Sequence, residues 1–176
     1  ISSDEGGDVL IADCDEKSID TAVIPFLYGV GKRAVDVLCL PMTRRNIENL
    51  DRISALGRRV LAPDEFPDSL LVENWRKGGV RVEGIAVDFI TPKNCLIEFC
   101  GQRFAVLLAP IEVLPAADVI YLNFPVELIE DVEANCYVNA AMKAKVVLLG
   151  DDAFGWRRRF EERNVEYFSL AGGAVW

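Results

Sequence analysis

The stretch Val35 to Leu50, VDVLCLPMTRRNIENL, constrains the fold of this chain more than any other. An apolar run typical of a buried strand leads directly into a short loop, and a helix-like segment follows. A loop at the carboxyl end of a buried strand is where α/β proteins usually keep their chemistry. This loop offers no good ligand for a divalent metal, no nucleophile–base pair and no glycine cradle for phosphate. The pattern therefore predicts an α/β scaffold with a chemically empty first candidate site.

Apolar periodicity along the rest of the chain indicates a mixed α/β protein. We expect strands at 8–12, 35–40, 59–62, 80–82, 85–90, 96–99, 104–108, 119–122, 146–149 and 167–170. We expect helices at 21–28, 46–56, 68–75, 127–142 and 156–163, with Asp68 as the cap of the third. A hairpin-rich middle flanked by α/β units fits two mixed sheets with helices outside better than one doubly wound sheet. No linker divides the pattern, so we expect a single domain over residues 1–176.

Composition excludes several classes of site. The chain has 176 residues and no histidine, so sites built on imidazole, from zinc hydrolases to Ser-His-Asp triads, are excluded. Its cysteines form no C-x-x-C pair, and we expect buried reduced thiols rather than a thiolate metal site. A formal net charge of −9 argues against a broad nucleic-acid-binding face but leaves room for local basic patches.

The ends of the sequence and its hydropathy bear on where the chain belongs. No apolar run reaches the roughly 18 residues of a membrane span, and no stretch of this sequence has the pattern of a signal peptide. The chain starts at Ile1 without an initiator methionine. We therefore expect a piece of a longer protein, whose membrane-spanning part would lie upstream.

Four segments carry apolar frames that are similar to the motifs of a known family. They are LPMTRRN at 40–46, NCLIEFCGQRFAVLLAPIE at 94–112, ADVIYLNFPVE at 117–127 and GDDAFGW at 150–156. In this order they resemble the metal-bearing motifs of the C-terminal metallo-β-lactamase-like domain of ComEC-type competence proteins. These proteins are the channels that bring transforming DNA across the bacterial inner membrane. In that family the first motif reads S-H-P-D-A-D-H, the third ends in H-H-G-S and the fourth ends in histidine.

The resemblance implies that every metal ligand of the family has been replaced. The positions where ligands would stand are held by Pro41, Thr43, Arg45, Asn46, Phe124, Pro125 and Trp156. The fold implied is an αββα sandwich that lacks the family's first hairpin. We expect no cofactor and no bound metal, and we expect the bulky side chains of Pro41, Met42, Phe124, Pro125 and Trp156 to fill the former metal pocket.

The function implied is that of an inactive domain in a DNA internalisation protein of the bacterial inner membrane, with a scaffolding or DNA-positioning role. Its partners would be the membrane-spanning part of the same protein and, weakly, single-stranded DNA. The side of the membrane stays open, and no small-molecule substrate is indicated. Candidate DNA contacts are the arginines on the degenerate loop and on the last helix, Arg44, Arg45, Arg157, Arg158 and Arg159. A solvated helix face is the simpler interpretation of the last three.

Two other functional classes stay open. The carboxylates Asp13 and Asp15 follow one strand, and Asp151 and Asp152 follow another. If they met at one sheet edge, they would suit Mg²⁺ or Mn²⁺ and a carboxylate-dependent hydrolase or nuclease. Solvated acidic loops and helix caps are the simpler explanation. The third class is a structural module that only packs against its own membrane domain or partner subunits.

Overall fold

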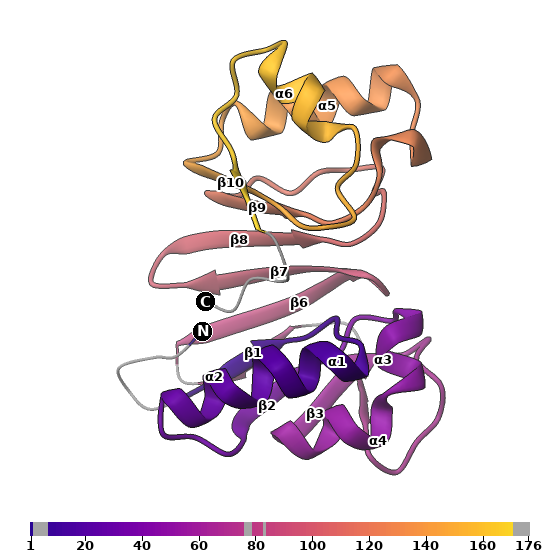
Figure 1. Cartoon of the computed structure of the whole chain (residues 1–176), viewed down its shortest axis with the longest axis vertical. Coiled ribbons are helices and arrows are strands. Elements are labelled where there is room, and N and C mark those ends of the chain that lie inside the picture. Colours follow the sequence, from indigo (N-terminus) through magenta and orange to yellow (C-terminus); the bar gives the residue numbers. More distant parts are fainter. Residues whose placement is uncertain (2–6, 76–78, 83, 171–176) are drawn as a thin grey trace. The chain divides into compact units, whose positions relative to one another are not determined.

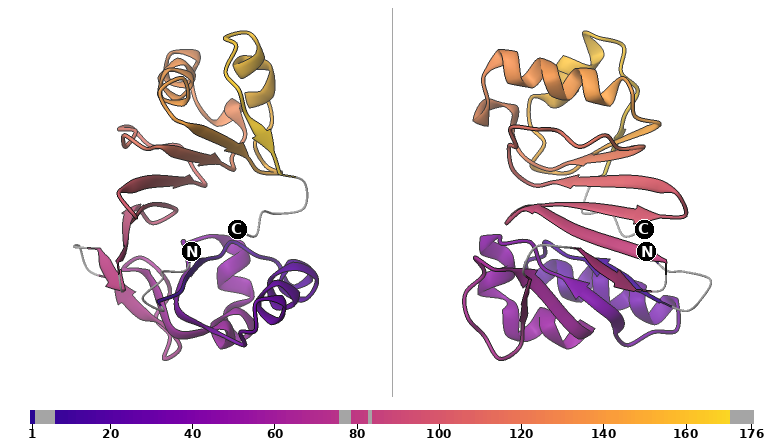
Figure 2. Two further views of the ribbon diagram at one scale, coloured as in Figure 1. Left: turned by 90° about the vertical axis from the view of Figure 1, so that its left-hand side faces the viewer. Right: turned by 180° about the vertical axis from the view of Figure 1, so that it is seen from behind.

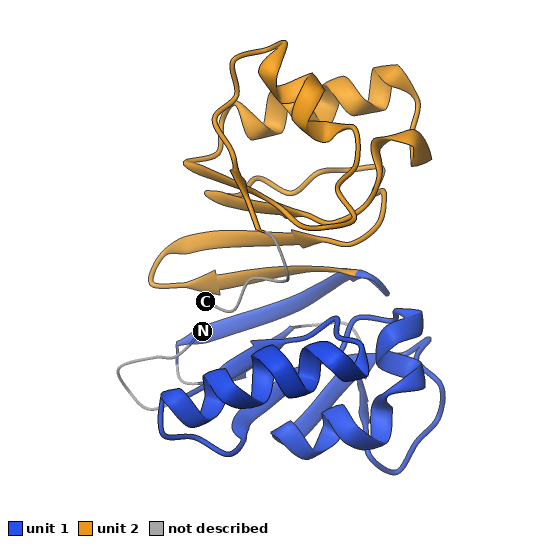
Figure 3. Cartoon of the chain, viewed as in Figure 1, with its two compact units in different colours: residues 1–93, 175–176 blue, residues 94–174 orange. Residues whose placement is uncertain are grey.

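The computed structural model describes residues 1, 7–75, 79–82 and 84–170 of the chain. It divides into two compact units, which are coloured separately in Figure 3. Unit 1 comprises Ile1–Lys93 with Val175–Trp176, and unit 2 comprises Asn94–Ala174. Both units combine strands with helices, which confirms the mixed α/β class with two sheets (Figure 1). Each unit is described below by itself.

Unit 1 is built on a parallel sheet with the strand order β1-β2-β3-β4. Its strands are β1 (Val9–Ile11), β2 (Val35–Cys39), β3 (Gly57–Pro63) and β4 (Glu73–Trp75). Residues Leu10, Leu38 and Val60 lie in one cross-strand row, since Leu10 pairs with Leu38 and Leu38 pairs with Val60. Two further strands of this unit, β5 (Val80–Val82) and β6 (Ile85–Thr91), pair antiparallel.

Helices cover one face of the unit 1 sheet. The first helical segment runs without a break through α1 (Glu16–Ser18), the π-helical η1 (Ile19–Val23) and α2 (Ile24–Gly29). The second runs through α3 (Arg44–Glu48), α4 (Leu50–Ile53) and the 3₁₀ turn η2 (Ser54–Leu56). Their apolar side chains, among them Ile19, Leu27 and Ile53, pack in one cluster with Leu38 and Leu40 of the sheet face. This cluster is the core of the unit.

The π turn in the first helix has a local cause. The backbone N–H of Ile24 bonds the carbonyl of Ile19, five residues back, just before Pro25. A proline ring inside an α-helix collides with the carbonyl four residues before it. The wider π turn moves that carbonyl aside, so the helix continues past Pro25. The helix also begins earlier than predicted because Asp15 caps it, accepting from Ser18 N at 2.7 Å.

Unit 2 has a mixed sheet with the order β11-β10-β9-β8-β7. Its strands are β7 (Asn94–Phe99), β8 (Gln102–Leu107), β9 (Val119–Leu122), β10 (Val146–Leu149) and β11 (Phe168–Ser169). The pair β7 and β8 is antiparallel, and β8, β9, β10 and β11 run parallel to one another. Ala105, Ile120 and Val147 share one row of this sheet, so the same face of three strands is apolar.

That apolar face carries the helices of unit 2, as both views of Figure 2 show. They are the 3₁₀ turn η3 (Val126–Leu128), α5 (Asp131–Ala141) and α6 (Trp156–Glu161). A capping box between Glu130 and Glu133 starts α5. Tyr137 and Val138 of α5 and Trp156 and Phe160 of α6 are buried in the same cluster as the sheet residues. The parallel strands and their helices place the carboxyl edge of this sheet next to Trp156.

One prediction about helices was wrong, and another was confirmed only in part. The segment 68–75 is not a helix capped by Asp68, because Glu73–Trp75 forms β4 and pairs parallel with β3, Leu61 lying opposite Glu73. The helix expected over 46–56 is present as helical turns that end at Leu56, but it begins at Arg44 and is interrupted at Asn49. The error at 68–75 comes from a partner distant in sequence, which a local pattern does not contain.

In the part of the chain that the structure describes, no helix is long and apolar enough to cross a membrane.

Candidate functional site

The first candidate site lies at the carboxyl edge of the unit 1 sheet. Strand β2 ends at Cys39, the backbone N–H of Leu40 still bonds the carbonyl of Leu61, and the chain then leaves the sheet through Pro41 and Met42. Thr43 caps α3, its hydroxyl accepting from Asn46 N at 3.2 Å. Pro41 is buried and Met42 is half-buried against the apolar core of this unit. The loop is therefore closely packed on its scaffold.

The side chain of Asn46 links two loops at this edge of the sheet through hydrogen bonds. Its side chain is fully buried, and Nδ2 donates to the carbonyl oxygens of Ala12 at 2.7 Å and Pro41 at 2.9 Å. Its Oδ1 accepts from the backbone N–H of Cys14 at 3.4 Å. The amide thus links the loop after β1 to the loop after β2. Asn46 is therefore a structural anchor between these two loops.

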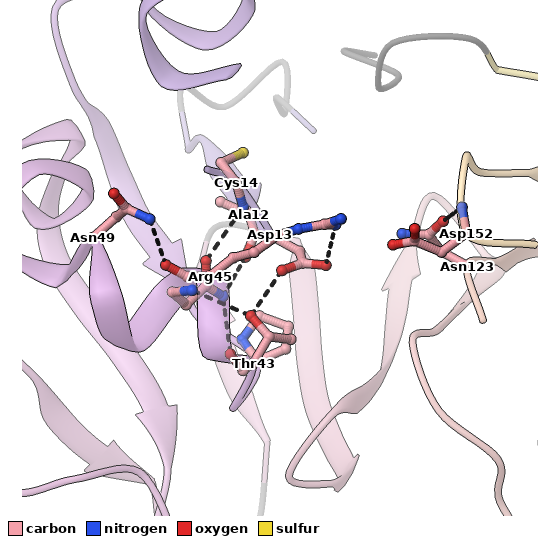
Figure 4. Close-up of polar contacts among 10 residues, drawn as sticks. Ala12, Asp13, Cys14, Thr43, Arg45, Asn49, Asn123 and Asp152 are labelled. Carbon is pink, nitrogen blue, oxygen red and sulfur yellow. Dashed lines mark hydrogen bonds and ion pairs between the residues drawn. The ribbon is translucent and has the colours of Figure 1, made fainter. Parts of the chain in front are cut away.

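A second polar group sits on the same edge, around Asp13 (Figure 4). The hydroxyl of Thr43 donates to Asp13 Oδ1 at 2.7 Å, and Arg45 Nη1 lies 3.6 Å from Asp13 Oδ2. Each carboxylate oxygen therefore faces a donor of the protein. Asp15 points elsewhere, because it caps the first helix, and this hydrogen bonding to Ser18 lowers the pKa of its carboxyl. The two carboxylates of the alternative metal site in unit 1 are both held by protein partners.

Cys14 follows Asp13 at this edge. Burial is the main reason why its pKa is raised from 9.0 to about 11, and the negative charge of Asp13 adds to the effect. A thiol in this state is protonated near neutral pH, so it is a poor nucleophile and a poor metal ligand. The five cysteines are all free. Cys39 and Cys95 are buried, as expected for structural thiols, whereas Cys14 is half-buried and the expectation of burial was wrong for Cys100 and Cys136, which are exposed.

In unit 2, aromatic side chains occupy the candidate edge. The ring of Phe124 meets that of Trp156 edge to face with centroids 5.6 Å apart, and it meets Tyr137 at 5.5 Å. Trp156 in turn lies 5.7 Å from Phe160, and its Nε1 donates to the carbonyl oxygen of Phe124 at 2.9 Å. The Tyr137 hydroxyl accepts from Ile111 N at 2.8 Å. Two of the predicted ligand positions, Phe124 and Trp156, are thus parts of a packed aromatic cluster.

Phe124 and Trp156, two of the five side chains that we expected to meet, pack against each other within unit 2, and Pro125 beside them is half-buried. Pro41, Met42, Thr43, Arg45 and Asn46 belong to unit 1, where they shape the loop described above. The role of Tyr137 was not foreseen from the sequence. Its only signal is an aromatic residue on the inner face of a predicted helix.

The acidic residues of unit 2 follow β10. Asn123 Oδ1 accepts from the backbone N–H of Asp152 at 2.9 Å, which ties this loop to the end of β9 (Figure 4). A side chain at Gly150 would place its Cβ 2.3 Å from Asn123 Oδ1, so the loop can approach this closely only with glycine there. The side chain of Asp151 is exposed and that of Asp152 is half-buried. Asp151 and Asp152 lie in unit 2, and Asp13 and Asp15 lie in unit 1.

Most of the candidate DNA-contact arginines are engaged in ion pairs. Arg44 bonds Glu48 at 2.6 Å, Arg158 bonds Glu162 at 3.0 Å, and Arg159 bonds Asp131. Arg45 lies beside Asp13, as described above. Arg157 is exposed on α6, and no ion pair is seen for it within the described ranges. Much of the positive charge that DNA would need is therefore offset by neighbouring carboxylates.

Over residues 1, 7–75, 79–82 and 84–170, no three His, Cys, Asp or Glu side chains lie close enough together to hold a metal ion. A comparison of the chain with models of protein families, with curated proteins and with solved structures finds no match in any of the three. The resemblance described above therefore depends on the motif frames.

Proposed function

We propose that this chain is a catalytically inactive metallo-β-lactamase-like module of the ComEC type, which serves as a scaffold in a DNA-uptake protein of the bacterial inner membrane. The observation that carries the proposal is the identity of the residues that stand at the metal-ligand positions of the family motifs. Asn46 and Trp156 stand at two histidine positions of the family motifs, and both are fully buried with their side-chain N–H groups bonded to backbone carbonyl oxygens. Side chains that hold loops in place are not available to bind a metal.

The secondary-structure architecture of each unit is compatible with this family. An αββα sandwich consists of two sheets, each with helices on its outer face, and each unit here has a sheet with helices on one face. In the active members a metal generates the attacking hydroxide and stabilises the charge that develops on the substrate. The ligand positions of this chain provide apolar, amide and guanidinium groups and one hydroxyl, that of Thr43, which bonds Asp13 and Asn46 N. This set does not support that chemistry.

The role left to such a module is binding or scaffolding. Its partner in the proposal is the membrane-spanning part of the same protein, with single-stranded DNA as a weak second partner. The ion pairs of Arg44, Arg45, Arg158 and Arg159 favour scaffolding over DNA positioning.

The test is a metal and nuclease assay on the purified chain. We expect elemental analysis to find less than one zinc or manganese per chain, and no cleavage of single- or double-stranded DNA with Mg²⁺, Mn²⁺ or Zn²⁺. The assay is repeated on an Asp13→Asn, Asp151→Asn variant. A metal-dependent cleavage that this variant loses would replace the proposal with a carboxylate-dependent nuclease.

A further inference from the structure

A pocket of about 460 Å³ lies at the amino edge of the unit 1 sheet, at the opposite ends of the strands from Asn46. Its lining residues come from the starts of β1, β2 and β3 and from the loop after α2, and they are Asp8, Gly31, Lys32, Arg33, Ala34, Asp36 and Arg58. None of them belongs to the candidate site described above. Most of them are charged, so the pocket is a polar one.

Strand register brings the charged residues of the sheet into one row. Val9 pairs with Val37 and Val35 pairs with Gly57, which places Asp8, Asp36 and Arg58 side by side on neighbouring strands. Gly57 keeps this end of the sheet tight, because a Cβ there would lie 2.5 Å from Cβ of Leu38. The row is therefore fixed by the backbone.

The two carboxylates of the pocket are directed at protein donors. Asp36 Oδ1 accepts from Arg58 Nη1 at 2.9 Å, and its Oδ2 accepts from the backbone N–H of Asp8 at 3.2 Å. The ammonium group of Lys32 donates to Asp8 Oδ2. These pairs offset the negative charge at the floor of the pocket and hold Lys32 and Arg58 in place.

Arg33 gives the pocket lining its net positive charge. The lining contains three cationic and two acidic side chains, so the balance is one positive charge. Arg33 is exposed, and no carboxylate pairs with it in the described part of the chain. Gly31, at a φ of 75°, turns the chain after α2, and the Lys32 N–H bonds Leu27 O at 2.8 Å. This turn sets Arg33 at the pocket beside Lys32 and Arg58.

The geometry points to a binding site for the phosphate group of a small phosphate monoester. A guanidinium binds phosphate oxygens through two parallel N–H groups, and Lys32 and Arg58 add further donors nearby. The volume is in the range of small-molecule sites. The inference does not depend on the proposed function, because the pocket lies at the opposite edge of the unit 1 sheet from the loop 40–46, and the other motif residues belong to unit 2.

The test is a titration of the chain with inorganic phosphate, adenosine 5′-monophosphate and a single-stranded oligonucleotide, each against chloride of matched ionic strength. Binding is followed by calorimetry and by the shift in melting temperature. We expect both small phosphates to bind, and Arg33→Ala to weaken this binding about tenfold, the usual cost of one charge-assisted hydrogen-bonding partner. The affinity of Arg33→Lys for the small phosphates should lie between that of the unchanged chain and that of Arg33→Ala. Lysine keeps the charge but lacks the planar pair of N–H groups.

Arg163→Ala is the matched control, since Arg163 is exposed in unit 2 and has no ion pair within the ranges described. It should bind as the unchanged chain does. Equal affinity of Arg33→Ala and the unchanged chain would overturn the inference, as would small phosphates that bind no better than chloride. Arg33-dependent binding of the oligonucleotide alone would also overturn it and assign the pocket to nucleic acid.

Discussion

The indole N–H of Trp156 donates to the backbone carbonyl oxygen of Phe124 at 2.9 Å, while the two rings meet edge to face. One residue thus provides both a polar and an apolar link between the end of β9 and the start of α6. A histidine at the same position would present a smaller ring and could turn its nitrogen towards a metal. Tryptophan fills the space and uses its nitrogen within the protein.

Replacing Trp156 with alanine should lower the free energy of unfolding by about 3–5 kcal/mol, because a fully buried large aromatic is lost from the core. Urea unfolding followed by circular dichroism measures the change. Phe154→Ala is the control, since Phe154 is 64% exposed and its loss should change stability by less than about 0.5 kcal/mol. A cost under about 1 kcal/mol for Trp156→Ala would contradict the packed arrangement.

Asn46→Leu should destabilise the chain by about 1–3 kcal/mol for each carbonyl oxygen left unpaired, those of Ala12 and Pro41. The leucine is close in size, so the loss reports on hydrogen bonds more than on volume. The melting temperature of Asn46→Leu is compared with that of Asn49→Leu, because the Asn49 side chain donates an exposed hydrogen bond to the carbonyl oxygen of Arg45. Similar effects of the two substitutions would show that Asn46 is not an anchor.

Cys14 should react slowly with iodoacetamide at pH 8. With a pKa raised to about 11, only about one thiol in a thousand is ionised there. We expect the rate, read by mass spectrometry of the peptide, to rise about tenfold per pH unit up to about pH 11. A rate that levels off near pH 9 would contradict the burial of this thiol. Cys100, which is exposed, serves as the internal comparison.

The same shift has a consequence for stability. The native thiol keeps its proton where the unfolded one, with a pKa of 9.0, releases it. The contribution of the Cys14 thiol to the free energy of unfolding is therefore fully present below pH 9, and it is lost as the pH rises from 9 to about 11. Cys39, whose pKa burial raises to about 12, acts in the same direction. The unfolding free energy of Cys14→Ser should accordingly fall less steeply over this range than that of the unchanged chain.

Single-stranded DNA should bind weakly, and Arg157→Glu should reduce the slope of log affinity against log salt by about 1. Arg158→Glu changes the charge by the same amount but should leave the slope nearly unchanged, because Arg158 is paired with Glu162. Fluorescence anisotropy at several salt concentrations measures both. Equal slopes in the two variants would mean that overall charge, and not contact at Arg157, governs binding.

Strands were easier to predict than helices in this chain. The runs at 119–122 and 146–149 became β9 and β10 with unchanged bounds, because a short apolar run between polar turns has few alternatives. The segment 68–75 offered Asp68 as a helix cap, which favoured a helix. Its end is a strand because β3 provides a partner, and no local pattern shows that.

The candidate site was predictable in position and not in its contacts. The loop after β2 was found from the apolar run before it, and Thr43 is a recognisable cap. The bonds that define Asn46 reach Ala12 and Cys14, more than thirty residues away. The ring contacts of Trp156 likewise join α6 to the end of β9. Such contacts follow from topology, which the sequence pattern only outlines.

The π turn at Ile19–Val23 means that the first helix contains one residue more than an α-helix of the same span needs. Deleting Thr21 or Ala22 would return the backbone to regular winding and press the ring of Pro25 against the preceding turn. It would also rotate Leu27 by roughly 100° about the helix axis relative to Ile19. The length of this segment is thus matched to its proline, and homologous chains that lack Pro25 would be free to lack the extra residue as well.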